Sequence, residues 1–341
     1  MITEFSIVMA QGKIANIVRK YLNGHLKVAE FAITNACIAK CSFCEIWKQQ
    51  PKVFADRQKA LEVIDRLADH GIVHLTITGG EPLLHPHVID IVKKATERKI
   101  HNAVLNAAPQ LLLKNDIVKR LEDAGNDMIS ISFDSGDPVI MAESRKIPNI
   151  IDDMARAMEV ISKTKIKTMA SVLIWNNNYN KMDDVCVNAK KMGFDIISIN
   201  YPTFSQSQVY PLGGEGISMS RENVIQGLES IIKLRKNKKY GIINSPSSIK
   251  NIINFLNDPK LVKYHCFGGT KVIFVDWFFD VHPCMQIPHT LGNVLSMDEK
   301  DYKMNPCNEC NMSWYRDFSA MFHGIKSVPV WLDSLQNFKR L

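Results

Sequence analysis

Short runs rich in apolar and β-branched residues alternate along the chain with longer stretches whose apolar residues recur every three or four positions. The runs predict strands at 28–34, 72–78, 100–105, 128–133, 167–174 and 195–201. The stretches between them predict helices at 57–70, 86–98, 114–124, 150–163 and 181–192. Strands that alternate with helices are typical of βα units and a parallel sheet. Six such units predict an α/β fold, a partial (β/α)6 TIM-like barrel over residues 28–240.

The helix ends carry their own signals. Side chains suited to cap a helix N-terminus are Asn115, Asp116 and Asp183, and glycines expected to end helices are Gly71, Gly125 and Gly193. Outside the alternation, residues 1–27 predict an amphipathic helix, residues 202–220 a loop over the barrel mouth, and residues 221–235 a further helix. Residues 241–341 predict a small C-terminal module with a β-hairpin and an aromatic helical tail.

Composition adds limits to this picture. The chain has 341 residues, of which 46% are hydrophobic and 23% charged, as expected of a globular protein with a large core. Its net charge of +7 is a mild basic bias, and the basic run 233–239 lacks interleaved aromatics, so we expect no nucleic-acid partner. No run of about 18 apolar residues and no signal peptide is evident. We therefore expect a cytoplasmic protein, with peripheral membrane contact through the amphipathic ends as the alternative.

Three of the eight cysteines follow the first predicted strand with the spacing C-x3-C-x2-C: Cys37, Cys41 and Cys44. Thiolates are the usual ligands of iron–sulfur clusters, and three ligands leave one iron of a [4Fe–4S] cluster open. A structural zinc site would require a fourth ligand nearby, and no His or Cys follows in the next twenty residues. We therefore favour a cluster over zinc or over unrelated buried thiols.

This motif, with the aromatic Phe43 before its last cysteine, resembles the signature of the radical SAM superfamily. The stretch Gly79-Gly80-Glu81-Pro82 after the second predicted strand resembles the second mark of that family. The resemblance implies a partial barrel, with sites at the carboxyl ends of its strands. It also implies that S-adenosylmethionine binds the open iron and is cleaved by one electron. The products would be methionine and a 5′-deoxyadenosyl radical, which abstracts hydrogen from a substrate C–H bond.

The same resemblance implies contacts with S-adenosylmethionine from Phe43, the Gly79–Pro82 stretch, Asn106, Ser132, Asp134, Arg145 and Tyr201. By the residues alone, two glycines allow a close approach of backbone, and a serine or aspartate at a strand end is a common cap. The chain departs from the family where the third strand ends Asn106-Ala107 and where the fifth strand lacks a glycine. These departures put individual contacts in doubt.

Four further cysteines lie in the C-terminal module: Cys266, Cys284, Cys307 and Cys310. Two β-rich runs, 271–275 and 277–281, predict a hairpin that leads to Cys284. Spacing alone allows either a structural zinc ion or a fully ligated cluster. The order of cysteine, hairpin, Pro-Cys, Gly-Asn and C-x2-C resembles the twitch or SPASM-like module of radical SAM enzymes. That resemblance implies an auxiliary [4Fe–4S] cluster that transfers electrons.

These features predict a radical SAM enzyme that oxidises a small polar molecule, such as a sugar or an aminocyclitol, with the second cluster accepting the electron of the substrate radical. A flavodoxin- or ferredoxin-type protein would supply the first electron. The alternatives are tailoring of a lipid or isoprenoid, tailoring of a peptide and, more remotely, a non-catalytic iron–sulfur electron carrier. No catalytic acid or base can be named from the sequence. The eighth cysteine, Cys186, is expected to be buried packing.

Overall fold

A computed structural model describes residues 19–21, 23–25, 27–100, 102–204, 219–304 and 307–338. Most of the predicted N-terminal helix over 1–27 and most of the predicted loop over 202–220 therefore lie outside the described residues. Among the described helices, none is long and apolar enough to cross a membrane.

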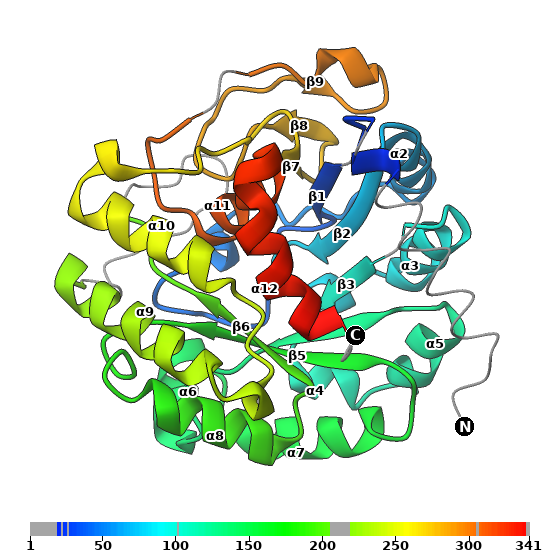
Figure 1. The fold of residues 1–341 in the computed structure, drawn as a ribbon. Coiled ribbons are helices and arrows are strands. Elements are labelled where there is room, and N and C mark those ends of the chain that lie inside the picture. Colours follow the sequence, from blue (N-terminus) through cyan, green and yellow to red (C-terminus); the bar gives the residue numbers. More distant parts are fainter. Residues whose placement is uncertain are drawn as a thin grey trace, which may run out of the picture.

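Within the described part of the chain, one nine-stranded sheet has the order β6-β5-β4-β3-β2-β1-β7-β8-β9. Six neighbouring strands run parallel to one another: β1 (Lys27–Ala32), β2 (Ile72–Thr78), β3 (Asn102–Asn106), β4 (Met128–Ser132), β5 (Lys167–Leu173) and β6 (Ile196–Asn200). Their bounds lie within two residues of the predicted ones. The sheet stays open, and its parallel strands alternate with helices, so the predicted partial barrel is confirmed (Figure 1).

Helices cover the outer face of the parallel strands (Figure 1). Those expected from the apolar periodicity are α2 (Arg57–Asp69), α3 (Val88–Glu97), α5 (Ile117–Asp123), α7 (Ile150–Ile161), α8 (Met182–Met192) and α9 (Arg221–Arg235). Gly71, Gly125 and Gly193 follow helices in left-handed conformation, with φ of 91°, 81° and 101°, as expected. The cap prediction for Asp183 is wrong. Asp183 lies inside the first turn of α8, where its carboxylate interacts favourably with the positive end of the helix dipole. Lys181 is the N-cap residue.

Other helices were not expected from the periodicity: α4 (Pro109–Leu112), α6 (Pro138–Arg145) and α10 (Pro246–Asn257). Each begins with a proline, which a helix accepts in its first turn because the missing N–H has no partner there. The aromatic tail forms α11 (Ser313–Ser319) and α12 (Val328–Phe338), separated by 3-10 turns over 320–327.

The predicted hairpin forms as β7 (Val272–Val275) and β8 (Asp280–His282), which pair antiparallel and continue to β9 (Gly292–Asn293). β7 also pairs parallel with β1, so the hairpin extends the barrel sheet at its β1 edge. The division of the chain at residue 240 into a barrel and a separate module stays a prediction.

Helix α11 spans the opening between the two edges of the parallel strands. The Tyr315 hydroxyl donates to Glu30 on β1, at 2.9 Å, and the Ser313 hydroxyl donates to Asn200 at the end of β6, at 3.1 Å. Asp317, also on α11, accepts a hydrogen bond from the Asn244 amide at 2.9 Å. A C-terminal helix therefore closes the wall that six strands leave incomplete.

Candidate functional site

The interior of the barrel is a cavity of about 390 Å³, lined by both polar and apolar side chains. Successive side chains of a strand point to opposite faces, so every second residue faces inward. At the level of the cavity many of the inward strand positions carry hydroxyl or amide groups: Thr76, Thr78, Asn106, Ser130, Ser132, Ser171, Ser198 and Asn200. The inward residues Met169 and Leu173 of β5 are apolar. The residues between them, such as Leu75, Ile77, Ile129 and Ile131, are fully buried in the core under the helices. The fold thus keeps its apolar packing outside the sheet and leaves polar groups inside.

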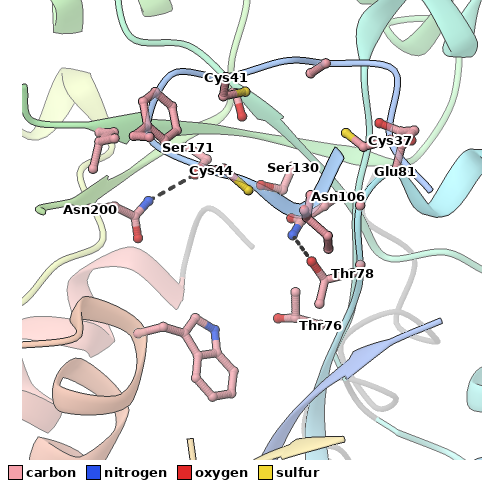
Figure 2. A pocket seen from close by; sticks show the side chains of 18 of the residues that line it. Cys37, Cys41, Cys44, Thr76, Thr78, Glu81, Asn106, Ser130, Ser171 and Asn200 are labelled. Carbon is pink, nitrogen blue, oxygen red and sulfur yellow. Dashed lines mark hydrogen bonds between the residues drawn. The ribbon is translucent and has the colours of Figure 1, made fainter. Parts of the chain in front are cut away.

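The three cysteines of the first motif line one side of this cavity (Figure 2). Cys37, Cys41 and Cys44 lie on the loop after β1, which turns back where the Cys44 N–H donates to the Cys41 carbonyl. All three are free thiols. Burial raises the pKa of Cys37 to about 11 and that of Cys44 to about 12. Cys37 and Cys44 are therefore neutral without metal, and a bound metal would have to displace their protons.

The Gly79–Pro82 turn is bonded to the cysteine loop through backbone atoms. The Gly80 N–H donates to the Thr34 carbonyl at 2.8 Å, and the Glu81 N–H donates to the Ala36 carbonyl at 2.7 Å. A Cβ atom on Gly80 would lie 2.2 Å from the Ala36 oxygen. Gly79 has a φ of 137°, and its Cβ would lie 2.3 Å from the Thr34 oxygen. The glycines are therefore required by the approach of the cysteine loop, a reason that the sequence pattern did not reveal.

Glu81 joins this turn to the segment after β3. Its carboxylate accepts the N–H of Leu83 at 3.1 Å and the N–H of Ala108 at 2.8 Å. Burial raises its pKa to about 8, and the two N–H donors oppose that rise. Glu81 and Pro82 both line the cavity. The carboxylate thus fixes backbone on two sides of the cavity.

Arg145, at the end of α6, lies beside the cysteine loop. Its Nη2 donates to Asp134 at 2.6 Å, its Nη1 lies 4.0 Å from Cys41 Sγ, and its guanidinium lies 4.8 Å from the centroid of the Phe43 ring. Asp134 is fully buried and also accepts from Ser144 and from the Leu173 N–H. Asp134 does not line the cavity, whereas Arg145 and Phe43 do. The structure therefore places Asp134 behind Arg145, as its support.

The remaining predicted contacts lie at strand ends around the same cavity. Asn106 donates to the Thr78 hydroxyl at 3.0 Å, and Ser132 and Tyr201 line the wall. A second bond of the same kind joins Asn200 to Ser171, at 3.0 Å (Figure 2). Thus all the residues predicted for this site except Asp134 line one cavity. The inward hydroxyls were missed, although their spacing of two residues along the strands could have revealed them.

Glu30 lines the cavity from the middle of β1. Its side chain is buried, one oxygen accepts the Tyr315 hydroxyl at 2.9 Å, and burial raises its pKa to about 7. Around it lie the aromatic residues Trp314 and Tyr315 of α11. The sequence pattern missed Glu30 because it lies in the apolar run 29–33, which reads simply as a buried strand.

The four C-terminal cysteines line a second cavity, of about 210 Å³. Cys266 and Cys307 exchange backbone hydrogen bonds of 2.8 and 3.0 Å. Backbone N–H groups donate to three of the sulfurs: Gly268 to Cys266, Gln286 to Cys284 and Glu309 to Cys307, at 3.3 to 3.4 Å. Burial raises the pKa of Cys284 to about 12 and that of Cys310 to about 11. Amide donors of this kind stabilise thiolate sulfur, so the site suits a bound metal centre.

The two cavities share a wall. Met312 and Tyr315 line both of them, and the two sets of cysteines contact one apolar cluster that includes Val28, Ala32 and Phe274. Nowhere in the described ranges do three His, Cys, Asp or Glu side chains come close enough to hold a single metal ion. At both sites the donor set is thiol only and lies beside a cavity, which fits an iron–sulfur cluster.

Comparisons with known proteins agree with this geometry. Residues 31–189 match the family model of the Radical SAM superfamily. The chain is 24% identical to the AdoMet-dependent heme synthase of Methanosarcina barkeri. The alignment extends over 290 residues and covers 79% of each protein. It is 31% identical to the GTP 3′,8-cyclase of Limosilactobacillus fermentum over 161 residues, only 47% of that enzyme's length.

Two solved structures have a similar fold. Streptococcus suis SuiB bound to S-adenosylmethionine gives a TM-score of 0.64 at 14% identity, over 95% of this chain and 74% of that one. anSMEcpe with bound AdoMet and a Cp18Cys peptide gives a TM-score of 0.62 at 14% identity, over 92% of this chain and 96% of that one. At this identity the likeness concerns the fold alone.

Proposed function

We propose that the chain is a member of the radical SAM superfamily, whose family model matches residues 31–189, and that Cys37, Cys41 and Cys44 hold a [4Fe–4S] cluster whose open iron binds S-adenosylmethionine. When bound, the cluster and S-adenosylmethionine supply a radical that abstracts hydrogen from a substrate C–H bond. The observation that carries this proposal is the single cavity lined by the three thiols, the glycine turn and the polar strand ends. The protein's own work is to position these groups and to exclude water.

Several residues would bind S-adenosylmethionine in this cavity. We assign its carboxylate to Arg145, the only cation among the described residues that line the cavity. The Gly79–Pro82 turn, with Asn106, Ser132, Phe43 and Tyr201, would contact the rest of the molecule. Asp134 would act through Arg145, because Asp134 lies outside the cavity and holds the guanidinium at 2.6 Å. A flavodoxin- or ferredoxin-type protein would deliver the electron.

For the four C-terminal cysteines we propose a second [4Fe–4S] cluster. A single zinc ion, with Zn–S bonds of about 2.3 Å, needs no cavity beside its ligands. The cavity of about 210 Å³ lined by all four cysteines is supporting evidence for a larger group. Four protein ligands would leave this cluster no open iron, so its role would be electron transfer. Its position behind the wall formed by Met312 and Tyr315 suits acceptance of an electron from the first cavity.

The lining of the first cavity favours a small polar substrate. Hydroxyl and amide groups line its strands, and the Glu30 carboxylate lies among them. A polar substrate could use the remaining hydrogen-bonding capacity of these groups, whereas an isoprenoid or lipid would make no hydrogen bonds with them. We therefore propose oxidation of a small polar molecule. A peptide is the second candidate, because anSMEcpe holds a peptide in its structure and one relative at 20% identity is named PqqA peptide cyclase.

The deciding experiment measures iron and sulfide per chain after anaerobic reconstitution, together with the formation of 5′-deoxyadenosine from S-adenosylmethionine. We expect about eight irons in the wild type, and about four with no cleavage in a Cys37/Cys41/Cys44 triple Ala variant. Cys186→Ala is the matched control, because Cys186 is fully buried in α8 away from both cavities, and it should keep both clusters. Cleavage by the triple variant would refute the mechanism.

A further inference from the structure

Arg316 is the largest side chain that is completely buried among the described residues, with 1% of its surface exposed. It lies on α11, next to Tyr315 in the wall of the second cavity. Its Nη1 donates to the Cys307 carbonyl at 3.3 Å and to the Asn308 amide oxygen at 2.8 Å. These bonds fix the guanidinium against the loop that carries Cys307 and Cys310.

The Arg316 guanidinium forms no ion pair with a carboxylate among the described residues. Both of its bonded acceptors are neutral, and its Nε and Nη2 have no hydrogen-bond partner among the described residues. The adjacent Asp317 carboxylate accepts from Ser248 and from Asn244 and interacts with Arg316 only through space, and burial raises its pKa to about 6. On the other side the guanidinium lies 5.3 Å from the ring centroid of Phe255. A buried cation that lacks an ion pair and has two unpaired nitrogens is unfavourable, so a further anion is expected beside it.

The four-cysteine site is the place where such an anion would form. Two other side chains of α11 also face it: the hydroxyl of Ser319 lies 3.7 Å from Cys266 Sγ, and Tyr315 lines the cavity. A cluster with four thiolate ligands carries net negative charge, and its reduction potential depends on nearby charge, hydrogen bonds and burial. Helix α11 thus brings a fixed positive charge to a site that becomes negative when loaded.

We propose that Arg316 is the built-in counter-charge of the four-cysteine cluster and raises the cluster's reduction potential, which makes it a better electron acceptor. This inference rests on the proposed function, because it requires a redox-active cluster at that site. Arg316 is a positioning residue here, since the structure gives it no contact with the first cavity. By raising the reduction potential of the second cluster, Arg316 would favour electron transfer from the first cavity to the second.

The test is a redox titration of the anaerobically reconstituted full chain, followed by electron paramagnetic resonance, on the wild type, Arg316→Gln and Arg316→Lys. We expect Arg316→Gln to lower the electron affinity of the second cluster at least tenfold, a shift of about 59 mV to more negative potential for one electron. Arg316→Lys keeps the charge and should stay near the wild type. The first cluster is the internal reference, and Arg235→Gln, whose guanidinium donates to the Asp333 carbonyl at 2.7 Å, is the matched control.

Several outcomes would overturn the proposal. A second cluster with unchanged potential in Arg316→Gln would show that the charge does not matter. If Arg316→Gln loses the second cluster, the Arg316→Lys variant distinguishes charge from shape. Retention of the second cluster's irons and of its potential in Arg316→Lys would support the counter-charge. Loss of these irons in Arg316→Lys would mean that only the shape of the Arg316 side chain matters. About four irons with zinc in the wild type would remove the second cluster from the proposed function and this role with it, while cleavage of S-adenosylmethionine would remain.

Discussion

At the scale of single residues, two buried carboxylates give the cavity its character, and they differ in their partners. Glu81 accepts two backbone N–H groups, so its charge is offset by fixed dipoles. Glu30 accepts one hydroxyl and otherwise faces the cavity. Glu81 is therefore part of the scaffold, whereas Glu30 is available to a substrate that donates a hydrogen bond.

The pH dependence of stability tests the environment of Glu30. Its pKa is raised from 4.5 to about 7 on folding, so the stability it contributes is full below pH 4.5 and is lost as the pH rises through 7. Between these limits we expect the wild type to lose up to about 3 kcal/mol of unfolding free energy relative to Glu30→Gln. Chemical denaturation from pH 4.5 to 8 measures this difference. Parallel pH curves would contradict it, and the exposed Glu159→Gln is the control.

Glu81→Gln tests the carboxylate that accepts two N–H groups. Glutamine keeps one acceptor oxygen, but its amide nitrogen must face the second N–H, which leaves a buried donor unpaired. We expect a loss of about 1–3 kcal/mol in unfolding free energy. We also expect weaker binding of S-adenosylmethionine with iron content unchanged, measured by equilibrium dialysis and iron assay. Unchanged affinity would remove Glu81 from the binding site.

At the scale of elements, much of the barrel could be predicted, because helices and strands that pack on one core repeat their apolar residues with a fixed period. The three-cysteine loop and the glycine turn were also predictable from local spacing. Glu30 was not, because an apolar run hides a single acid. The inward hydroxyls were missed because small polar residues in a strand look like surface, although their spacing of two residues is a usable signal. The position of Arg316 depends on packing between α11 and a distant loop, which no local pattern encodes.

The cysteine loop and the glycine turn act as one element. Gly80→Ala would place a Cβ atom 2.2 Å from the Ala36 carbonyl oxygen. The atoms nearest to this Cβ, from Ala36 and Asn35, all belong to the backbone, so they cannot rotate away as a side chain could. We expect this variant to bind fewer than half of the first cluster's irons and to lose cleavage of S-adenosylmethionine. Iron analysis after reconstitution measures it. Gly324→Ala, at a φ of 58° and with no atom within 4 Å of its Cβ position, is the control for backbone strain without a steric clash, and it should keep full iron loading. Full iron loading in Gly80→Ala would show that the loop can shift.

The second cysteine site is a separable element of the chemistry. We expect Cys310→Ala to lose about four of about eight irons and to retain measurable cleavage of S-adenosylmethionine, because the first three thiols are untouched. Oxidised product should disappear while 5′-deoxyadenosine still forms. Complete loss of cleavage with four irons retained would mean that the second site also supports the first electron transfer.

At the scale of the whole molecule, the barrel and the C-terminal segment share structure. β7 pairs with β1, α11 bonds to both edges of the parallel strands, and one wall separates the two cavities. Buried Lys27 on β1 adds an ion pair of 2.5 Å with Glu299. These contacts join residues 113 to 285 positions apart in the sequence, so we expect one cooperative unit.

Differential scanning calorimetry tests this unity. We expect a single unfolding transition for the apo chain, with equal calorimetric and van't Hoff enthalpies, because the sheet is continuous from β6 to β9. Two resolved transitions, one of which disappears in a chain ending at residue 240, would instead support two independent domains.

The pairing of β1 with β7 also constrains the order of assembly. The first cysteine loop leaves the ribosome early, but the strand that covers the outer edge of β1 follows some 240 residues later. At typical synthesis rates of about 5–20 residues per second, that edge waits more than ten seconds for its partner. Until then β1 presents unpaired backbone groups beside reactive thiols, a combination that invites both aggregation and oxidation. Production of this protein therefore depends on what shields the nascent chain during that interval, as well as on the supply of iron and sulfide.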